Sequence, residues 1–195
     1  MAIANIPQAA IDLILKAEGL DQPGSFPGGD SGVTIGIGYD LGYTTVDQFE
    51  SDWEAFLTHE QIVRLHKAIG VRGADAAKLA HQFADIKIKR ADAEKVFLKR
   101  TLPREILKAE QAFPGIDALC ANAQGALVSL IYNRGSSMLG ERRSEMRAIR
   151  DAVPHKDLKK IAAQLRSMKR LWVGQGLDGL IKRREAEAKL VESCL

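Results

Sequence analysis

The sequence predicts an α+β fold, in which a small β-hairpin lobe is joined to a mostly helical lobe with a cleft between them. Eight of the 17 glycines lie in residues 19–42, so irregular and β structure is expected in one short region. From Thr44 onward, apolar residues recur at helical spacing. We therefore expect a single domain over residues 1–195, with a β-rich lobe at about 20–45 and a helical lobe at about 46–195.

Composition places the chain among ordinary globular proteins. Of its 195 residues, 46% are hydrophobic and 27% are charged, which excludes a disordered or fibrous protein. The excess of 28 Lys and Arg over 25 Asp and Glu leaves a net charge of +3. Such a mildly basic surface can approach an anionic polymer, but the charge alone identifies no partner.

The sequence shows neither a Sec signal peptide nor a membrane-spanning run. Met1 is not followed by a basic segment and a long apolar stretch, and no run reaches the roughly 18 apolar residues that a span requires. We expect synthesis in the cytoplasm, no stable membrane insertion, and delivery by another route to any target outside.

The first predicted helix covers residues 7–18 and is expected to pack on the helical lobe. Pro7 suits a first turn, and the spacing places Glu18 on the same face as Ile11, Ile14 and Leu15. With Gly19 as the helix cap, Glu18 lies in the last turn, where the helix dipole and partial desolvation favour the protonated carboxyl. Glu18 is therefore a candidate general acid. The alternative is a solvated or paired structural glutamate.

A hairpin is predicted in residues 33–40, where side chains alternate between an apolar and a nearly bare face. Thr34 and Asp40 share the bare face with Gly36 and Gly38. A turn at residues 36–38 makes Thr34 and Asp40 cross-strand neighbours, and the glycines leave room for a ligand against the backbone. A purely structural hairpin is the alternative. Its apolar face comprises Val33, Ile35, Ile37 and Tyr39.

Two further aspartates flank this region. Asp30 lies in the glycine loop of residues 28–32 and is a second carboxylate candidate. Asp21 suits a turn, and we expect it to bond to backbone rather than to act chemically.

Cysteines and histidines indicate no metal site. Cys120 and Cys194 lack CxxC spacing, and we expect both to be reduced. The four histidines show no ligand spacing. No metal and no cofactor are expected.

Three blocks, in the right order, resemble the phage-type lysozymes of glycoside hydrolase family 24. The first is Glu18-Gly19-Leu20 followed by Thr34-Ile35-Gly36-Ile37-Gly38. The second, residues 131–135, resembles the family's aromatic-Asn-x-Gly element and contains Asn133. The third, residues 179–187, resembles its Gly-Leu-x-x-Arg-Arg-x-x-Glu helix and contains Arg183.

This resemblance implies a muramidase that cleaves between N-acetylmuramic acid and N-acetylglucosamine in peptidoglycan. The family's general acid and water-holding threonine correspond to Glu18 and Thr34. Its usual aspartate position is occupied here by Gly28, whereas in the pesticin-like branch the aspartate follows the turn and matches Asp40. Asp30 remains the second choice.

The resemblance also implies supporting residues. Gly36, Gly38 and Tyr39 belong to the hairpin motif, and an arginine of the last block, best matched by Arg183, approaches the acid in relatives. We expect Asn133 to be a buried structural amide in preference to a cleft-lining group. The expected partner is the peptidoglycan glycan strand, bound by a monomer.

Three other functions are alternatives to a muramidase: a lytic transglycosylase, a peptidoglycan-binding module and a nucleic-acid binder. A lytic transglycosylase would use Glu18 alone, and a non-catalytic peptidoglycan-binding module would need none of the three residues. Basic stretches at 87–90, 142–143 and 159–160 suggest nucleic acid, but nearby acids such as Asp92 favour solvated helix faces, so no nucleic-acid partner is expected. A prophage endolysin released through a holin and a secreted toxin remain equally open.

Overall fold

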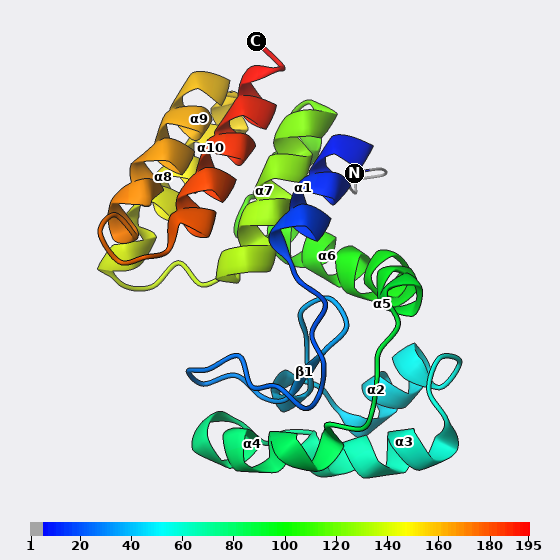
Figure 1. Ribbon diagram of the computed structural model, residues 1–195. Helices are drawn as coiled ribbons and strands as arrows, with labels where there is room; N and C mark the ends of the chain where they lie inside the picture. Colours follow the sequence, from blue (N-terminus) through cyan, green and yellow to red (C-terminus); the bar gives the residue numbers. More distant parts are fainter. Residues whose placement is uncertain (1–5) are drawn as a thin grey trace. The chain divides into compact units, whose positions relative to one another are not determined.

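A computed structural model describes residues 6–195 and divides them into two compact units (Figure 1). One unit contains residues 6–17 together with Arg104–Leu195, and the other is Glu18–Pro103. Most of the chain is helical and its only sheet in the described residues has two strands, which confirms the predicted α+β class. We expected residues 46–103 to group with the later helices, whereas they group with the hairpin.

The unit Glu18–Pro103 combines the hairpin with short helices. Threonine caps set two of the helix starts: Thr45 accepts from the Gln48 N–H, and Thr58 forms a reciprocal capping box with Gln61. Its elements are β1 (Thr34–Ile35), β2 (Tyr39–Asp40), α2 (Val46–Trp53), α3 (His59–Leu65), α4 (Gly73–Ala80) and α5 (Arg90–Val96).

The core of this unit is built on the hairpin's apolar face, as predicted. Ile35 and Leu41 are fully buried and share this core with Phe49 and Trp53 of α2. Burial of such side chains contributes about 1.5–3 kcal/mol each before entropy costs. The hairpin is therefore held by its hydrophobic side, and its polar side carries the candidate catalytic residues Thr34 and Asp40.

Between α5 and α6 (Leu102–Ala112) the chain remains helical, but residues Phe97–Thr101 form a π-helical segment that interrupts the α-helical hydrogen bonding. Pro103 explains the interruption, because proline has no N–H to donate to the preceding turn and its ring displaces that turn's carbonyl. The sequence pattern predicts helix over 90–112 but not this break.

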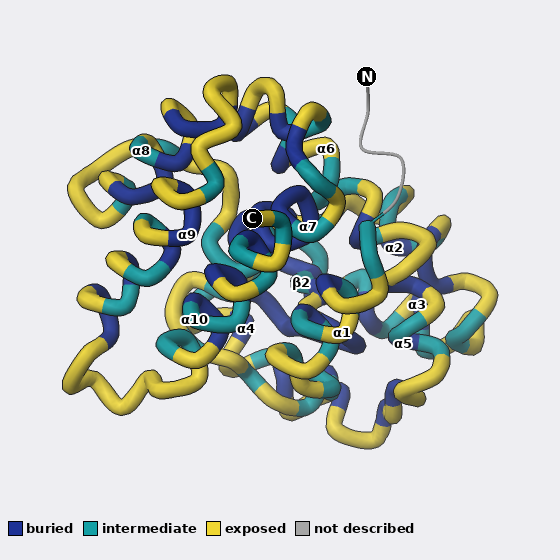
Figure 2. Tube along the Cα trace, turned by 90° about the horizontal axis from the view of Figure 1, so that it is seen from above, coloured by how far each residue is buried: buried dark blue, intermediate teal, exposed yellow. Residues whose placement is uncertain are grey.

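The second unit is an all-helical bundle around α7 (Ala121–Arg134). Residues 123–131 of α7 are all buried, and α1 (Gln8–Ala17) and α10 (Asp178–Glu192) pack against it (Figure 2). At Gly125 an added Cβ would lie 2.3 Å from the Ala10 Cβ, so the approach of α1 to α7 requires glycine. The bundle is completed by α8 (Ser144–Ala152) and α9 (Leu158–Ser167).

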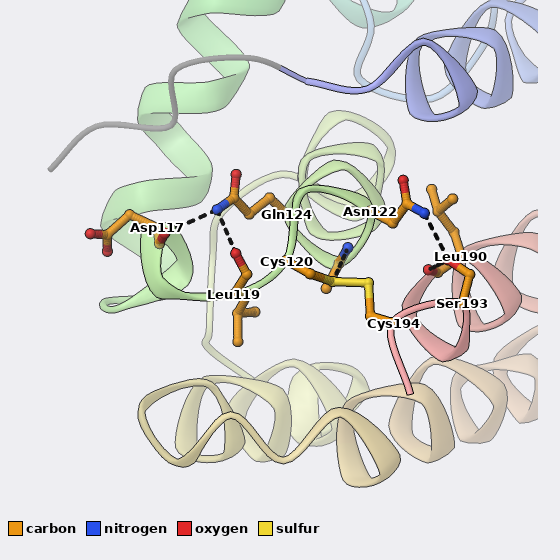
Figure 3. The surroundings of a disulfide bond; sticks show 9 residues. Asp117, Leu119, Cys120, Asn122, Gln124, Leu190, Ser193 and Cys194 are labelled. Atoms are coloured by element: carbon orange, nitrogen blue, oxygen red, sulfur yellow. Dashed lines mark hydrogen bonds between the residues drawn. A yellow bond between two sulfur atoms is a disulfide. The ribbon is translucent and has the colours of Figure 1, made fainter.

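A disulfide joins Cys120 to Cys194, so the expectation of reduced cysteines was wrong (Figure 3). Cys120 caps the start of α7, and Cys194 follows the end of α10. Because α10 packs on α7, these ends meet, with 6.4 Å between the two Cα atoms. An Asn122–Ser193 hydrogen bond of 2.8 Å lies beside the bridge.

Among residues 6–195, none of the helices has both the length and the apolar character needed to cross a lipid bilayer.

Candidate active site

Glu18 is the first residue after α1, since the helix ends at Ala17, and it is partly exposed. Gly19 does not have the positive φ of a left-handed cap, so that part of the prediction was wrong. Three residues after Glu18, Asp21 pairs with Gly36 through hydrogen bonds of 2.7 and 2.9 Å. Glu18 is thus separated from the hairpin by at most about 10 Å of extended chain.

The hairpin has the predicted register, with Thr34 opposite Asp40 and Ile35 opposite Tyr39. Gly36 and Gly38 have φ values of 64° and 61°, which glycine adopts without strain. The Gly38 N–H donates to the Asp21 carboxylate at 3.0 Å. Asp21 therefore braces the turn, in agreement with the structural role expected for it.

Gly32 links the two polar side chains of the hairpin. The Thr34 hydroxyl donates to the Gly32 carbonyl at 3.3 Å, and the Gly32 N–H donates to Asp40 Oδ1 and Oδ2 at 2.9 and 3.1 Å. A second N–H, from Gly42, donates to Asp40 Oδ1 at 2.8 Å. One backbone residue thus fixes both Thr34 and Asp40.

The position of Asp40 is more enclosed than the sequence suggests. We expected an open, glycine-lined face, but Asp40 is half-buried and Thr34 is buried. Burial raises the pKa of the Asp40 carboxyl, while the Gly42 and Gly32 N–H groups and the charge of Arg72 oppose this rise. The backbone donors account for how a partly desolvated carboxylate is accommodated there.

Close packing makes glycine necessary at position 32. A Cβ there would lie 2.3 Å from the Gly42 nitrogen and 2.5 Å from Asp40 Oδ1. Neither is the end of a flexible side chain, because the nitrogen is backbone and the carboxylate is held by it. The glycine-rich segment is visible in the sequence. That Gly32 packs against Gly42 and Asp40 is not.

Asp30 is exposed and anchored rather than loose. Its carboxylate accepts hydrogen bonds from the Tyr43 hydroxyl at 3.0 Å and from Arg72 at 3.3 Å. The Arg72 guanidinium also lies 4.9 Å from the centre of the Tyr43 ring. Asp30 lies in the glycine loop as expected, but it is held there in a polar cluster with Tyr43 and Arg72.

Gly36 and Tyr39 support the hairpin from its buried side. A Cβ on Gly36 would lie 2.7 Å from the Trp53 ring, so the space expected for a ligand there is filled by Trp53. The Tyr39 hydroxyl donates to Asp52 at 2.9 Å, and burial raises the pKa of Tyr39 to about 12. Gly38, by contrast, is exposed.

Arg183 lies in the other unit, on α10, and is 5% exposed. It donates to the Ser129 hydroxyl and carbonyl at 3.3 and 3.2 Å. Its neighbour Arg184 is fully buried and bonds to Glu187 at 2.7 Å; burial lowers the pKa of Arg184 and raises that of Glu187. Sequence reasoning missed Ser129. It placed Glu187 in the third block without naming it as partner of the arginines, although its i+3 and i+4 spacing from them is a signal.

Asn133 lies in the last turn of α7 and is partly exposed, so the preference for a fully buried amide was wrong. Nearby in the same unit, the guanidinium of Arg134 lies 5.1 Å, and that of Arg184 5.9 Å, from the Trp172 ring centre. Burial lowers the pKa of Arg134 to about 10. Within residues 6–195 no three potential metal ligands of the His, Cys, Asp and Glu types lie together.

Comparison with known proteins identifies the family. The family model described as phage lysozyme matches residues 29–187, a range that includes Asp30, Thr34, Asp40 and Arg183 and begins after Glu18. No curated protein matches the sequence. The matched range covers most of the chain, and it includes the hairpin whose register the structure shows. The chain therefore belongs to the phage lysozyme family and is a peptidoglycan hydrolase.

Proposed function

We propose that the protein is a muramidase, which cleaves the glycosidic bond between N-acetylmuramic acid and N-acetylglucosamine in peptidoglycan. Family membership and the three sequence blocks support this choice of bond. In this proposal Glu18 protonates the leaving oxygen, and Thr34 and Asp40 hold the attacking water. Retention of both groups argues against a transglycosylase, which needs no water.

The observation that carries the proposal is the Gly32 link. The Thr34 hydroxyl uses its proton on the Gly32 carbonyl, so its oxygen is available to accept a hydrogen from water. Asp40 Oδ2 has the longer contact to Gly32, at 3.1 Å, and can accept the second hydrogen. A water held by both hydrogens directs its lone pair away from them, toward the anomeric carbon of a bound sugar.

The two carboxyl groups require different protonation states at the same pH. Asp40 must be ionised to hold water, and two backbone N–H donors favour that form. Glu18 must be protonated to act as the acid. Because a water is placed between carboxylate and sugar, we propose inversion of the anomeric configuration.

Asp30 is the second candidate for the water-holding carboxylate. Its anchoring by Tyr43 and Arg72 gives it a defined position, four residues before Thr34. Paired rates decide between the two: Asp40→Asn is expected to reduce turnover much more than Asp30→Asn. A severe loss for Asp30→Asn beside a mild loss for Asp40→Asn would reverse the assignment.

Product analysis tests the proposed bond. Incubation with purified peptidoglycan, followed by mass spectrometry, is expected to show new reducing ends in muramic acid. Glu18→Gln should lose roughly 10²- to 10⁴-fold in rate while remaining folded. The matched control Glu60→Gln, an exposed glutamate on α3, should retain activity.

Three other results would contradict the proposal. Anhydro-muramyl ends would indicate a transglycosylase, and binding without cleavage would indicate a binding module. Unchanged cleavage by folded Glu18→Gln would show that another group is the acid. We also propose that the protein acts as a monomer on peptidoglycan outside the cytoplasm, after holin-type release or toxin-type delivery. From the hairpin motif alone, we propose a similarity to the pesticin-like branch.

A further inference from the structure

A hollow of about 410 Å³ lies within the unit Glu18–Pro103. Of its lining, Trp53 also contacts the hairpin, at Gly36 and Tyr39, from the buried side. One wall is formed by residues 53, 55–58 and 61, from the end of α2 to the first turn of α3. The other is formed by residues 87–89, which lead into α5, and by Asp92 in the first turn of α5. This volume falls within the range of small-molecule sites, about 300–1,000 Å³.

Hydrogen-bond donors predominate around this hollow. Trp53 is 1% exposed, and its indole nitrogen is buried without a hydrogen-bond partner among the described residues. An indole N–H can only donate, so it requires an acceptor. Gln61 uses its amide oxygen to accept from the Thr58 N–H, which leaves its NH₂ group as a donor. The Gln61 NH₂ group therefore favours a ligand with an acceptor, whereas the indole N–H is enclosed by the protein.

The charged side chains around the hollow favour a ligand that carries negative charge. Lys87 and Lys89 contribute positive charge to the lining, and Lys95 lies 5.8 Å from the centre of the Phe56 ring. The opposing charge is Asp92, which is already paired with Lys95 at 3.4 Å. Lys89 is exposed immediately before α5, where its ammonium group is accessible to a ligand.

Apolar side chains provide the remaining surface. Phe56, Leu57 and Ile88 line the hollow between the donors and the lysines. An ion with no apolar part would leave these side chains in water, whereas a ligand with small apolar groups beside its carboxylates would cover them. The lining therefore fits an acidic peptide with small side chains better than a free anion or an uncharged sugar.

We propose that this hollow is a second, non-catalytic binding site for an acidic peptide of the kind that peptidoglycan carries as its stem. Carboxylates would meet Lys89 and Lys87, whose ammonium group also donates to the Ala84 carbonyl at 2.7 Å, and alanyl methyl groups would contact the apolar residues. The site would hold the wall polymer through its peptide while the glycan strand is cut elsewhere. This inference rests on the proposed function for the identity of the polymer.

The two tryptophans of the chain make binding directly measurable, because a ¹⁵N-labelled sample gives one indole N–H signal from each. Trp172→Phe assigns the signals. Titration with the soluble stem peptide L-Ala-γ-D-Glu-meso-diaminopimelate-D-Ala is expected to shift the Trp53 signal saturably. Lys89→Gln should weaken binding roughly three- to tenfold. Lys159→Gln, an exposed lysine of α9 in the other unit, is the matched control and should bind normally.

Several outcomes overturn the inference. The first is a Trp53 signal that does not move with the stem peptide. The second is a Trp53 signal that moves equally with triacetylchitotriose or with acetate at matched ionic strength. The third is equal affinity of Lys89→Gln and Lys159→Gln for the stem peptide. Binding is read without turnover, so its failure is distinct from failure of the proposed function. A protein that binds the peptide but releases no muramic acid ends contradicts only the latter.

Discussion

Removal of the Cys120–Cys194 disulfide is expected to destabilise the unit that contains it. Cys194→Ser is the most informative change, because Cys120 also caps α7 by accepting from the Ala123 N–H at 3.4 Å. The Cys194 variant opens the bridge and retains this cap. The residue positions differ by 74, so the loop closed by the bridge is long.

The chain-entropy model gives the magnitude of the effect. For a separation of 74 residues, the loss of unfolded-state entropy corresponds to about 4.5 kcal/mol at 25 °C. For a protein of this size, that free energy corresponds to a decrease in Tm of roughly 9–18 °C. Strain released in the native state would reduce both values.

The assay must separate the two units. Trp172 reports on the unit with the disulfide, and Trp53 reports on Glu18–Pro103. Fluorotryptophan labelling provides one fluorine signal from each, followed during urea unfolding. We expect the Trp172 midpoint to fall more than the Trp53 midpoint, and reductant should produce the same shift in the wild-type protein while leaving Cys194→Ser unchanged.

A Cys194→Ser protein with an unchanged Trp172 midpoint would refute this reasoning, since it would show that the bridge does not constrain the unfolded chain. The expected result has a functional consequence. Disulfides persist in oxidising compartments and are reduced in the cytoplasm. The protein would therefore be more stable where peptidoglycan lies than where it is synthesised.

The remaining predictions concern the hairpin site. Gly32→Ala should lower turnover and cost about 1–3 kcal/mol of stability through overpacking, as measured by urea unfolding, whereas Gly179→Ala, with open space around it, should do neither. Because burial raises the Asp40 pKa, the folded protein binds the proton more tightly, so stability should fall as pH rises from the ordinary carboxyl pKa through the raised one. Turnover should be lost as pH falls through that raised pKa, and Asp40→Asn should remove the stability change. Outer-membrane-permeabilised Gram-negative cells should be cleared in a turbidity assay by the wild-type protein.

Local patterns were sufficient to predict the hairpin. Alternation of apolar and polar residues determines which side chains share a face. The turn is determined by the three residues 36–38, of which two are glycines. The pairing of Thr34 with Asp40 follows from both. The end of the first helix was misplaced by one residue. Helix ends depend on local capping geometry, which the sequence does not specify when glycine can adopt several conformations.

Contacts between distant residues account for what was missed. The disulfide depends on α10 returning along α7, and the burial of Arg184 depends on the packing of α10 against α7 and α9. Asp40 illustrates the same limit within the site. Its register was predictable, but its enclosure arises largely from Gly32, which lies eight residues before it and reaches it only where the preceding loop folds back onto the hairpin. The contact with the Gly42 N–H, by contrast, is local.

Arg72 connects the two carboxylates that compete for the same role. It pairs with Asp30 at 3.3 Å, and its charge opposes the rise in the Asp40 pKa, which the negative charge of Asp30 enhances. Asp30→Asn therefore changes the charge environment of Asp40 even if Asp30 never touches the water. Removing that negative charge should lower the Asp40 pKa, so an Asp40 mechanism predicts that Asp30→Asn moves the loss of turnover to lower pH. The double variant resolves this: if Asp40 alone holds the water, adding Asp30→Asn to Asp40→Asn should cost nothing further.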